Sequence, residues 1–467
     1  MRTYFWLTGC SALGVCLLVA GEPFFWDTIQ LGARHADWFY HQPPGTLLLP
    51  DEMDSGHIPA FGAYLAACWH FFGQNLMVSH LAMFPFIWLV LWQGCRLVSN
   101  LPLGLGRMGA LAAFLLLIMD ATLVAQLSLI SPDIVLVGAF LLGINSVLRK
   151  QPLWLTIAVI LLGLTSLRGM MVAFGLFLWQ LVLIIAEGSK KDRPLATFKL
   201  LLPYLPGGII ALAYLLYHYQ TKGWVGTHSD SPWAASFASQ GGVSLIKQAA
   251  VVAWRMVDFG RIFLFLALLF TWWRSGWVWN YTIKRAVILL LIMGFVLALP
   301  ALISPGLSQH RYLLPVYLTV AYLFLLLLKK VKSKTWKTTM IAVVLLGQIS
   351  GHFWVYPDHI AQGWDASLAH KPYFEARAEG LMYLQQENIP LSKVGTAFPE
   401  VGEQHLRMLN GEREGLAPYD LDQQDYIWYS NIMNDFSDEE LLTLQKNWTP
   451  VFTFRKRGVH LEIYHLK

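Results

Sequence analysis

The dominant pattern in this sequence is a series of long apolar runs separated by short polar connections. A helix needs about 20 apolar residues to cross the roughly 30 Å hydrocarbon layer of a membrane. Runs of this kind recur along the first three quarters of the chain, so the pattern predicts an α-helical polytopic membrane protein. About eleven spans are expected, at 4–20, 76–98, 104–123, 127–148, 152–167, 170–186, 196–219, 258–273, 286–303, 312–328 and 338–355.

The run 152–186 admits two interpretations. It is one apolar stretch that is interrupted only at Thr165-Ser166-Leu167-Arg168-Gly169. A single long helix would hold Arg168 at mid-membrane depth, where a charge is costly. We therefore predict two short helices with Arg168 at the surface between them, and the single helix is the alternative.

The basic connections orient the spans, because Lys and Arg concentrate on the cytoplasmic side of membrane proteins. With the N-terminus inside and 152–186 split in two, all the basic runs fall on that side. This predicts a multi-pass protein of the cell inner (plasma) membrane, with a cytoplasmic N-terminus, a retained signal anchor and an extracytoplasmic tail. The basic runs are Arg149-Lys150, Lys190-Lys191-Asp192-Arg193, Arg274 with Lys284-Arg285, and Lys329-Lys330 with Lys332, Lys334 and Lys337.

Three connections on the outer side are long enough to carry structure of their own. They are 21–75, 220–257 and the tail 356–467. In the first, the short apolar stretch 59–72 predicts an interfacial helix on the membrane surface, and 244–257 is a candidate for a second. We predict a transmembrane domain, 1–355, whose outer loop carries the site, and a small extracytoplasmic α/β domain, 356–467.

The tail alternates between helical and strand patterns. Helical spacing, a Ser cap followed by acidic residues, and two apolar strands around a Lys-Arg-Gly turn are local signals of defined elements. The expected elements are a helix at 374–387, a strand at 393–398, a helix that starts at Ser437, and a terminal hairpin of 450–454 and 459–464 around Lys456-Arg457-Gly458.

Composition agrees with a membrane protein. Of the 467 residues, 56% are hydrophobic and only 13% are charged, which excludes a purely soluble globular chain. Residues 1–355 hold 24 Lys and Arg against 12 Asp and Glu, whereas the tail holds 10 against 17. The excess of base lies in short runs between apolar segments, so it does not indicate nucleic-acid binding. The four cysteines have no disulfide or zinc spacing, and no nucleotide-binding signature is present.

Acidic residues at the outer ends of spans are the first candidates for chemistry. Asp27 follows the first span, and Asp133 stands in Ser131-Pro132-Asp133 at the outer start of the fourth. The alternative for Asp133 is an N-terminal cap, since Pro and an acid suit the first turn of a helix. The alternative for Asp27 is an ordinary interfacial acid. Asp120, near the end of the third span, is interpreted as structural.

Cations on this acid-rich side are few, so they are candidates for holding a phosphate. His310-Arg311-Tyr312 opens the tenth span, where a helix N-terminus could add to the attraction of an anion. Arg168 and Arg34 are on the same predicted side. The alternative is that Arg and Tyr simply anchor helices at the interface.

Five short stretches match a known pattern in the same order along about residues 1–330. They are Asp27-Thr28, Gly56-His57-Ile58-Pro59-Ala60, Ser131-Pro132-Asp133, Leu167-Arg168-Gly169 and Arg311-Tyr312-Leu313-Leu314-Pro315. In this layout the chain resembles the polytopic glycosyltransferases of the C superfamily, which use polyprenyl-phosphate sugars. The nearest likeness is to the protein O-mannosyltransferases and the bacterial lipid A aminoarabinose transferases. The chain lacks the Glu that follows the first acid in the family and the second Pro of the stretch at 57–60.

The resemblance implies an enzyme that moves a sugar from a polyprenyl-phosphate carrier to a glycan, lipid or protein acceptor on the outer face, with inversion. It implies that Asp27 is the general base and that Asp133 orients the site. Donor phosphate would be held by Arg168, Arg311, His310 and Tyr312, and the acceptor or carrier by Asp54, His57 and Arg34. No cofactor is required; a divalent cation among Asp27, Asp54 and Asp133 is compatible with the residues, although the relatives do not suggest one.

Two other classes of function stay open at this stage. A transporter or lipid flippase would need charges buried in mid-span and inverted repeats, and the sequence shows neither clearly. An assembly subunit that docks through its tail is the third class. The outer loop with its clustered acids favours the enzyme.

Overall fold

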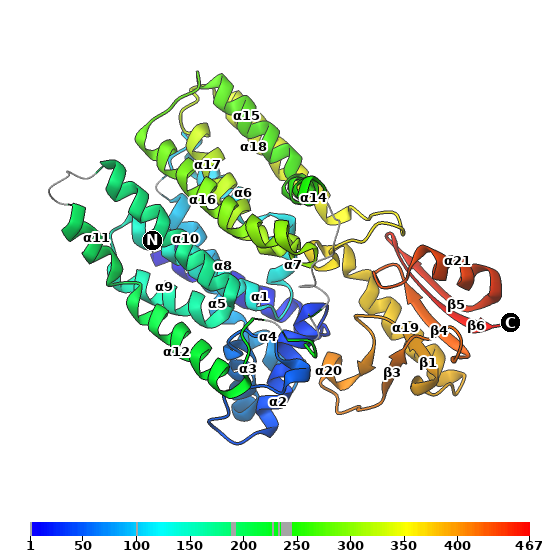
Figure 1. The fold of residues 1–467 in the computed structure, drawn as a ribbon. Coiled ribbons are helices and arrows are strands. Elements are labelled where there is room, and N and C mark those ends of the chain that lie inside the picture. The colour runs from blue at the N-terminus through cyan, green and yellow to red at the C-terminus, as the bar shows by residue number, and fades with distance from the viewer. Residues whose placement is uncertain (1, 100, 188–192, 227, 232–233, 235–244) are drawn as a thin grey trace.

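The apolar runs fold into a bundle of helices with a small sheet unit at one end, as the computed structural model shows (Figure 1). The structure describes residues 2–99, 101–187, 193–226, 228–231, 234 and 245–467. The predicted basic run at 190–193 and the outer segment 220–257 therefore lie partly outside the described residues.

Every predicted span contains helix. The helices of this part are α1 (Arg2–Leu18), α2 (His35–His41), α3 (Ala60–Phe72), α4 (Leu76–Ala82), α5 (Phe84–Val98), α6 (Gly106–Ile118), α7 (Ala121–Leu127), α8 (Pro132–Leu148), α9 (Pro152–Thr165), α10 (Leu167–Glu187), α11 (Arg193–Leu201), α12 (Leu205–Lys222), α14 (Leu245–Val257), α15 (Arg261–Arg274), α16 (Tyr281–Ile303), α17 (Leu314–Leu328) and α18 (Lys334–Ser350).

Several of these helices are long and apolar enough to cross a membrane by themselves. Within the described residues there are four, or five if the bent pair α6 and α7 is counted as one span. The four are Leu76–Val98, Leu167–Ala186, Tyr281–Ile303 and His310–Leu328. The chain is thus a helical membrane protein, and the count of eleven spans stays a prediction.

The predicted break within 152–186 is confirmed. α9 ends at Thr165, Ser166 is extended, and α10 begins at Leu167. The Ser166 hydroxyl accepts a hydrogen bond from the Gly169 backbone N–H at 3.1 Å. A Cβ at Gly169 would lie 2.1 Å from the carbonyl oxygen of Leu162, so only glycine lets the two helices approach this closely. Arg168 therefore sits in the first turn of a new helix.

The predicted span at 104–123 is not one continuous helix. α6 ends at Ile118, and α7 leaves it at an angle of 80°. The cause is Asp120, whose carboxylate accepts hydrogen bonds from the backbone N–H groups of Thr122 and Leu123 and so caps α7. The same carboxylate pairs with the buried Arg261 at 2.6 Å, which agrees with the structural role expected for Asp120.

The segment 21–75, predicted as an outer loop and called the outer loop below, forms helices at the expected places. α3 covers the stretch predicted as interfacial and ends in the exposed Phe71 and Phe72. α14 covers the second such stretch. A π-helix, η1 (Ile29–Arg34), leads from the start of the loop into α2.

The tail holds a six-stranded mixed sheet of order β2-β3-β1-β4-β6-β5. β1 runs parallel to β3 and β4, and the remaining pairs are antiparallel. Its elements are α19 (Pro372–Gln386), β1 (Val394–Thr396), β2 (Gly402–Glu403), α20 (His405–Met408), β3 (Gly415–Pro418), β4 (Tyr426–Ser430), α21 (Asp438–Asn447), β5 (Trp448–Lys456) and β6 (Val459–Leu466). The predicted helices, strand and hairpin are confirmed, including a capping box between Ser437 and Glu440.

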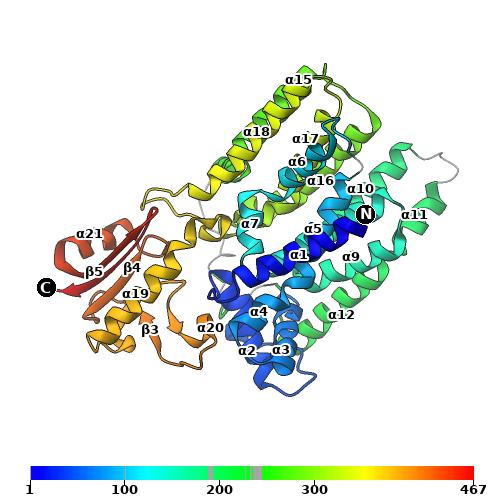
Figure 2. The ribbon, with the colours of Figure 1, turned by 180° about the vertical axis from the view of Figure 1, so that it is seen from behind.

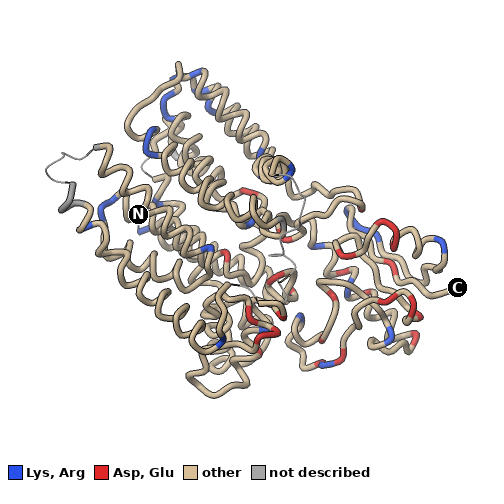
Figure 3. Tube along the Cα trace, in the orientation of Figure 1, with Lys and Arg blue, Asp and Glu red and all other residues tan. Residues whose placement is uncertain are grey.

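Opposite charges gather at different parts of the molecule. Many of the acidic residues lie where the helices meet the sheet unit and within that unit, whereas basic residues mark the far ends of several helices (Figure 3). The ribbon seen from behind shows the helical bundle and the sheet unit as two separate parts (Figure 2). The boundary between the two parts is where the candidate site lies.

Candidate active site

The tail holds the start of the outer loop in place. Phe25 and Trp26 are buried in the same hydrophobic core as the sheet. Phe25 stacks on His370, with ring centroids 4.6 Å apart, and the Thr28 hydroxyl accepts the Phe25 N–H at 3.0 Å. Asp27 lies between these anchored residues. Its backbone is therefore fixed by packing from a segment more than 300 residues away in the chain.

One guanidinium gathers three carboxylates. Arg311 forms ion pairs with Asp27, Asp133 and Asp365, the Asp133 contact being 3.2 Å. Arg311, Asp133 and Asp365 have side chains only 4–6% exposed, whereas Asp27 is 22% exposed. Asp27 is thus the carboxylate of this cluster that solvent or a substrate reaches most readily.

Arg168 forms the second cation of the cluster. Its Nη1 lies 2.8 Å from Oδ1 of Asp133, and its guanidinium stacks 3.8 Å above the ring of Tyr312. The N-cap of α8 is Ser131, whose hydroxyl accepts the Asp133 N–H. Asp133 lies in the first turn of α8 beside Pro132, as the capping alternative expects, but the side chain that caps the helix is Ser131. The Asp133 carboxylate bridges Arg168 and Arg311.

A cavity of about 200 Å³ opens beside this cluster. Asp27, Arg168, Tyr312 and His57 line its polar end. The other wall is apolar and comes from α10, α16 and the turn that follows α16. Its residues are Leu167, Met171, Leu297, Pro300 and Leu307, with Leu31 and Ser55 at the side of the outer loop. The cavity therefore has a charged end and an apolar wall, a combination that suits an amphipathic ligand.

A solved structure matches the chain over nearly its whole length. It is the crystal structure of ArnT from Cupriavidus metallidurans bound to undecaprenyl phosphate, with a TM-score of 0.52 and 12% sequence identity. The match covers 99% of this chain and 98% of that chain. The chain has the fold of ArnT. No family model matches the sequence, and no curated protein matches it.

The resemblance expected from five short motifs is therefore confirmed at the level of the fold. ArnT is a lipid A aminoarabinose transferase, one of the two groups that the motifs indicate. The likeness does not single out the protein O-mannosyltransferases.

His57 reaches the cavity as a neutral side chain. Burial and the neighbouring Arg168 lower the pKa of His57 to about 4. Its Nδ1 has no hydrogen-bond partner within the described residues. A neutral imidazole can donate or accept one hydrogen bond at neutral pH but adds no positive charge to a phosphate site.

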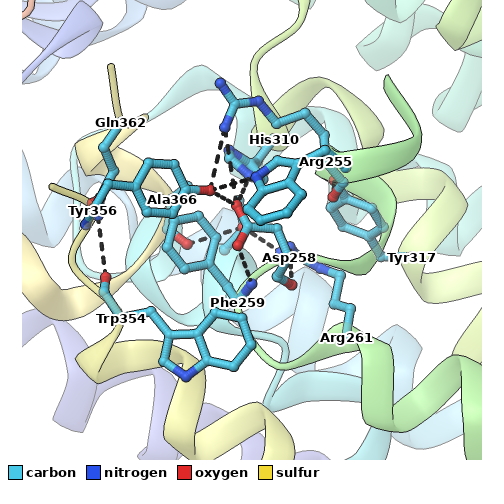
Figure 4. A network of polar contacts seen from close by, with 12 residues as sticks. Arg255, Asp258, Phe259, Arg261, His310, Tyr317, Trp354, Tyr356, Gln362 and Ala366 are labelled. Carbon is cyan, nitrogen blue, oxygen red and sulfur yellow. Dashed lines mark hydrogen bonds and ion pairs between the residues drawn. The ribbon is translucent and has the colours of Figure 1, made fainter. Parts of the chain in front are cut away.

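His310 lies apart from the cavity, in a second polar network (Figure 4). Its Nε2 donates to Asp258 at 2.7 Å, and both side chains are completely buried. The Tyr356 hydroxyl also donates to the Asp258 carboxylate, and Nη1 of Arg255 lies 3.9 Å from Oδ2 of Asp258. His310 and Arg311 are adjacent in η4 (His310–Leu313) but contact different carboxylates. The structure therefore gives no support to the predicted direct role of His310 in binding phosphate.

Two further candidates also lie outside the cluster. Asp54 is buried, 3.0 Å from His218 and 2.6 Å from Lys222. Arg34 donates to Gln30 within its own helical turn. Neither lines the cavity. Asp54 instead ties the outer loop to the end of α12, and so supports the position of His57 three residues later.

Asp365 is the member of the site that sequence reasoning missed. It lies in the short helix η6 (Trp364–Ala366) of the tail, where no motif marks it. Burial raises the pKa of Asp365 to about 6, against the opposing effect of Arg311. Gln126 of α7 donates to the Asp365 carboxylate at 3.3 Å. The acidic partners of Arg168 and Arg311 come from segments that are distant in the sequence, so no local pattern reveals them.

The site does not assemble the three carboxylates suggested for a divalent ion. Asp27 and Asp133 share Arg311, whereas Asp54 pairs with His218 and Lys222. Across the described residues, no group of three or more His, Cys, Asp or Glu side chains is arranged to hold a metal ion.

Proposed function

We propose that this protein is an integral-membrane glycosyltransferase that takes a sugar from a polyprenyl-phosphate carrier and gives it to an acceptor hydroxyl. The observation that carries the proposal is the cavity in which Asp27 and Arg168 meet an apolar wall. A lipid-linked sugar phosphate has the same division into an anionic head and a long apolar chain. The shared fold with ArnT, whose structure contains undecaprenyl phosphate, supports the same class of donor.

Asp27, the most exposed carboxylate of the cluster, suits a general base. In the proposed step, the acceptor oxygen forms a bond to the anomeric carbon while its proton passes to Asp27. The bond from the anomeric carbon to the phosphate oxygen breaks, and polyprenyl phosphate leaves with the electron pair. Attack from the face opposite the phosphate inverts the anomeric centre.

The two arginines take different parts in this proposal. Arg168 is 19% exposed and lines the cavity, so it can meet the phosphate as negative charge grows on it. Arg311 is saturated by three carboxylates and holds Asp27 and Asp133 in position. Tyr312 stacks on Arg168 and fixes the direction of its guanidinium.

Ligand binding can be tested without knowing the sugar. We expect polyprenyl phosphate to raise the thermal unfolding temperature of the purified protein, because a ligand present at about 100 times its Kd stabilises the folded state by about 2.7 kcal/mol. Polyprenol of the same chain length lacks the phosphate and is the matched control. Arg168→Ala should remove most of the difference between the two lipids. Equal stabilisation by both would contradict a phosphate site.

The predicted orientation completes the proposal, since the site must lie on the outer face. A reporter enzyme that is active only after export, fused after Tyr356, should be active. The same reporter fused after Lys330, in a predicted inner connection, should be inactive. A cytoplasmic signal at Tyr356 would place the cluster on the wrong side of the membrane.

A further inference from the structure

A second, larger hollow lies on another side of the junction between helices and sheet. It has a volume of about 790 Å³. Its apolar lining comes from the turn after α6, from α7, from the end of α18 with the turn that follows it, and from the start of the tail. Lys371, Lys456, Arg457 and Glu375 supply its charged lining. Three cations thus face one carboxylate. This hollow shares no lining residue with the cavity at Asp27.

The cations of the hollow differ in whether they are neutralised. Lys371 pairs with Glu22, and Lys456 pairs with Glu375 at 2.5 Å. Arg457 is exposed and has no ion-pair or hydrogen-bond partner among the residues that the structure describes. The positive charge at this edge is therefore available to an anion from outside the chain.

The backbone holds Arg457 in a defined place. Lys456 pairs with Val459 across β5 and β6, which leaves a two-residue turn of Arg457 and Gly458. Both have positive φ, 49° and 84°, as in a type I′ turn. A Cβ on Gly458 would lie 3.0 Å from Val355, so the tip of the hairpin packs against the segment that leaves α18 (Figure 1).

The lining of the hollow also contains a hydrogen-bond donor without a partner, on His352. His352 lines the hollow, and its Nδ1 accepts the Leu368 N–H at 3.3 Å. Its Nε2 therefore carries the proton. This donor is buried and has no partner within the described part of the chain.

An apolar track leads into the hollow along α18. Leu346, Ile349 and Phe353 are 67%, 44% and 70% exposed. Leu346 and Ile349 lie in α18, and Phe353 ends the 3-10 turn that follows it, η5 (Gly351–Phe353). Their spacing of three and four residues places them on one side of this helical segment. Ile349 and Phe353 line the hollow itself. On a membrane helix such a face contacts acyl chains, and its last two residues line the same hollow as the unpaired Arg457.

We propose that this hollow binds the head group of an anionic membrane lipid, with the lipid phosphate at Arg457 and His352 and the acyl chains along Leu346, Ile349 and Phe353. The site is independent of the proposed transfer reaction. A lipid bound here would contact helix ends and the β5–β6 hairpin together, and so would fasten the sheet unit to the membrane surface.

Photo-crosslinking tests the proposal directly. Phe353→p-benzoylphenylalanine, at an exposed position, is placed in the full-length protein in nanodiscs of phosphatidylglycerol and phosphatidylcholine with matched chains. We expect the anionic lipid to be captured about fivefold more per molecule, the equivalent of about 1 kcal/mol for one basic residue near an anionic surface. Arg457→Asn should abolish this preference. Asn accepts the left-handed conformation of the turn, so the hairpin is retained.

Arg455→Gln is the matched control. Arg455 lies two residues away in the same hairpin, pairs with Glu462, and does not line this hollow. This variant should keep the lipid preference. Equal capture of both lipids by the parent protein, or an unchanged preference in Arg457→Asn, would overturn the proposal. Loss of the preference on adding excess inorganic phosphate would assign the hollow to free phosphate instead of a lipid.

Discussion

Asp27→Asn should lower the rate of sugar transfer by roughly 10²–10⁴-fold while the protein remains folded and inserted. The substitution keeps the shape of the side chain and removes only its ability to accept a proton. Asp27 is the most exposed carboxylate of its cluster and lines the cavity, which distinguishes it from Asp133 and Asp365. The measurement is turnover of purified variants at saturating donor, together with their thermal stability.

Asp51→Asn is the matched control for this prediction. Asp51 belongs to the same outer loop, is more exposed, and pairs with Lys222 at a distance from the cavity lining. Its loss should leave turnover within a few fold of the parent enzyme. If Asp27→Asn also retained near-normal turnover, Asp27 could not be the base, and the role would have to pass to another carboxylate or the proposal would fail.

We expect different losses in two arginine variants: donor binding in Arg168→Ala and folding stability in Arg311→Ala. Arg168→Ala should raise the KM for the donor about ten- to a hundredfold, the loss expected for one charged hydrogen-bond partner of about 1.5–3 kcal/mol. Arg311→Ala should lower the free energy of unfolding by about 3–5 kcal/mol, because it leaves buried carboxylates without their counter-charge. Donor KM and thermal stability are measured on the same preparations.

Lysine variants separate binding from simple anchoring. Arg168→Lys should rescue the donor KM only partly, since Lys keeps the charge but loses the planar, two-pronged donor geometry and the stacking on Tyr312. If Lys substituted fully, and Arg168→Ala lost stability while keeping its donor KM, then Arg168 would only anchor the helix.

Local signals predicted much of the fold correctly. The break before Arg168, the capping box at Ser437 and the hairpin at Lys456-Arg457-Gly458 each depend on a few neighbouring residues, so the sequence displays them directly. The bend at Asp120 was missed because its cause, a carboxylate that caps a helix and pairs with Arg261, combines a local effect with a distant partner.

The site was only half predictable for the same reason. Four residues of the site were predicted because they lie beside span ends and within short motifs: Asp27, Asp133, Arg168 and Arg311. Their ion pairs, however, join segments that lie far apart; the Arg311–Asp27 contact spans 284 residues. Asp365 comes from a tail segment in which spacing gives no indication of a site. Pairing at such separation depends on the packed fold, not on any local pattern.

The tail forms part of the candidate site as well as the sheet unit. It contributes Asp365 to the cluster, and its core holds Phe25 and Trp26 on one side of Asp27. Thr122 and Gln126 of α7 also donate to backbone oxygens of Ala366 and Asp365, at 3.0 Å each. These contacts explain why the carboxylates meet where helices and sheet join.

Transfer of a labelled sugar by the reconstituted protein is the direct test of the proposed glycosyltransferase activity. Purified protein in vesicles is given a panel of polyprenyl-phosphate sugars labelled in the sugar, with an envelope lipid and glycan extract as the acceptor source. We expect that for one donor the label moves to an acceptor, polyprenyl phosphate is released in equal amount, and Asp27→Asn abolishes both. Label that crosses the bilayer while still attached to its carrier, with no acceptor product from any donor, would contradict a transferase and indicate a lipid transporter.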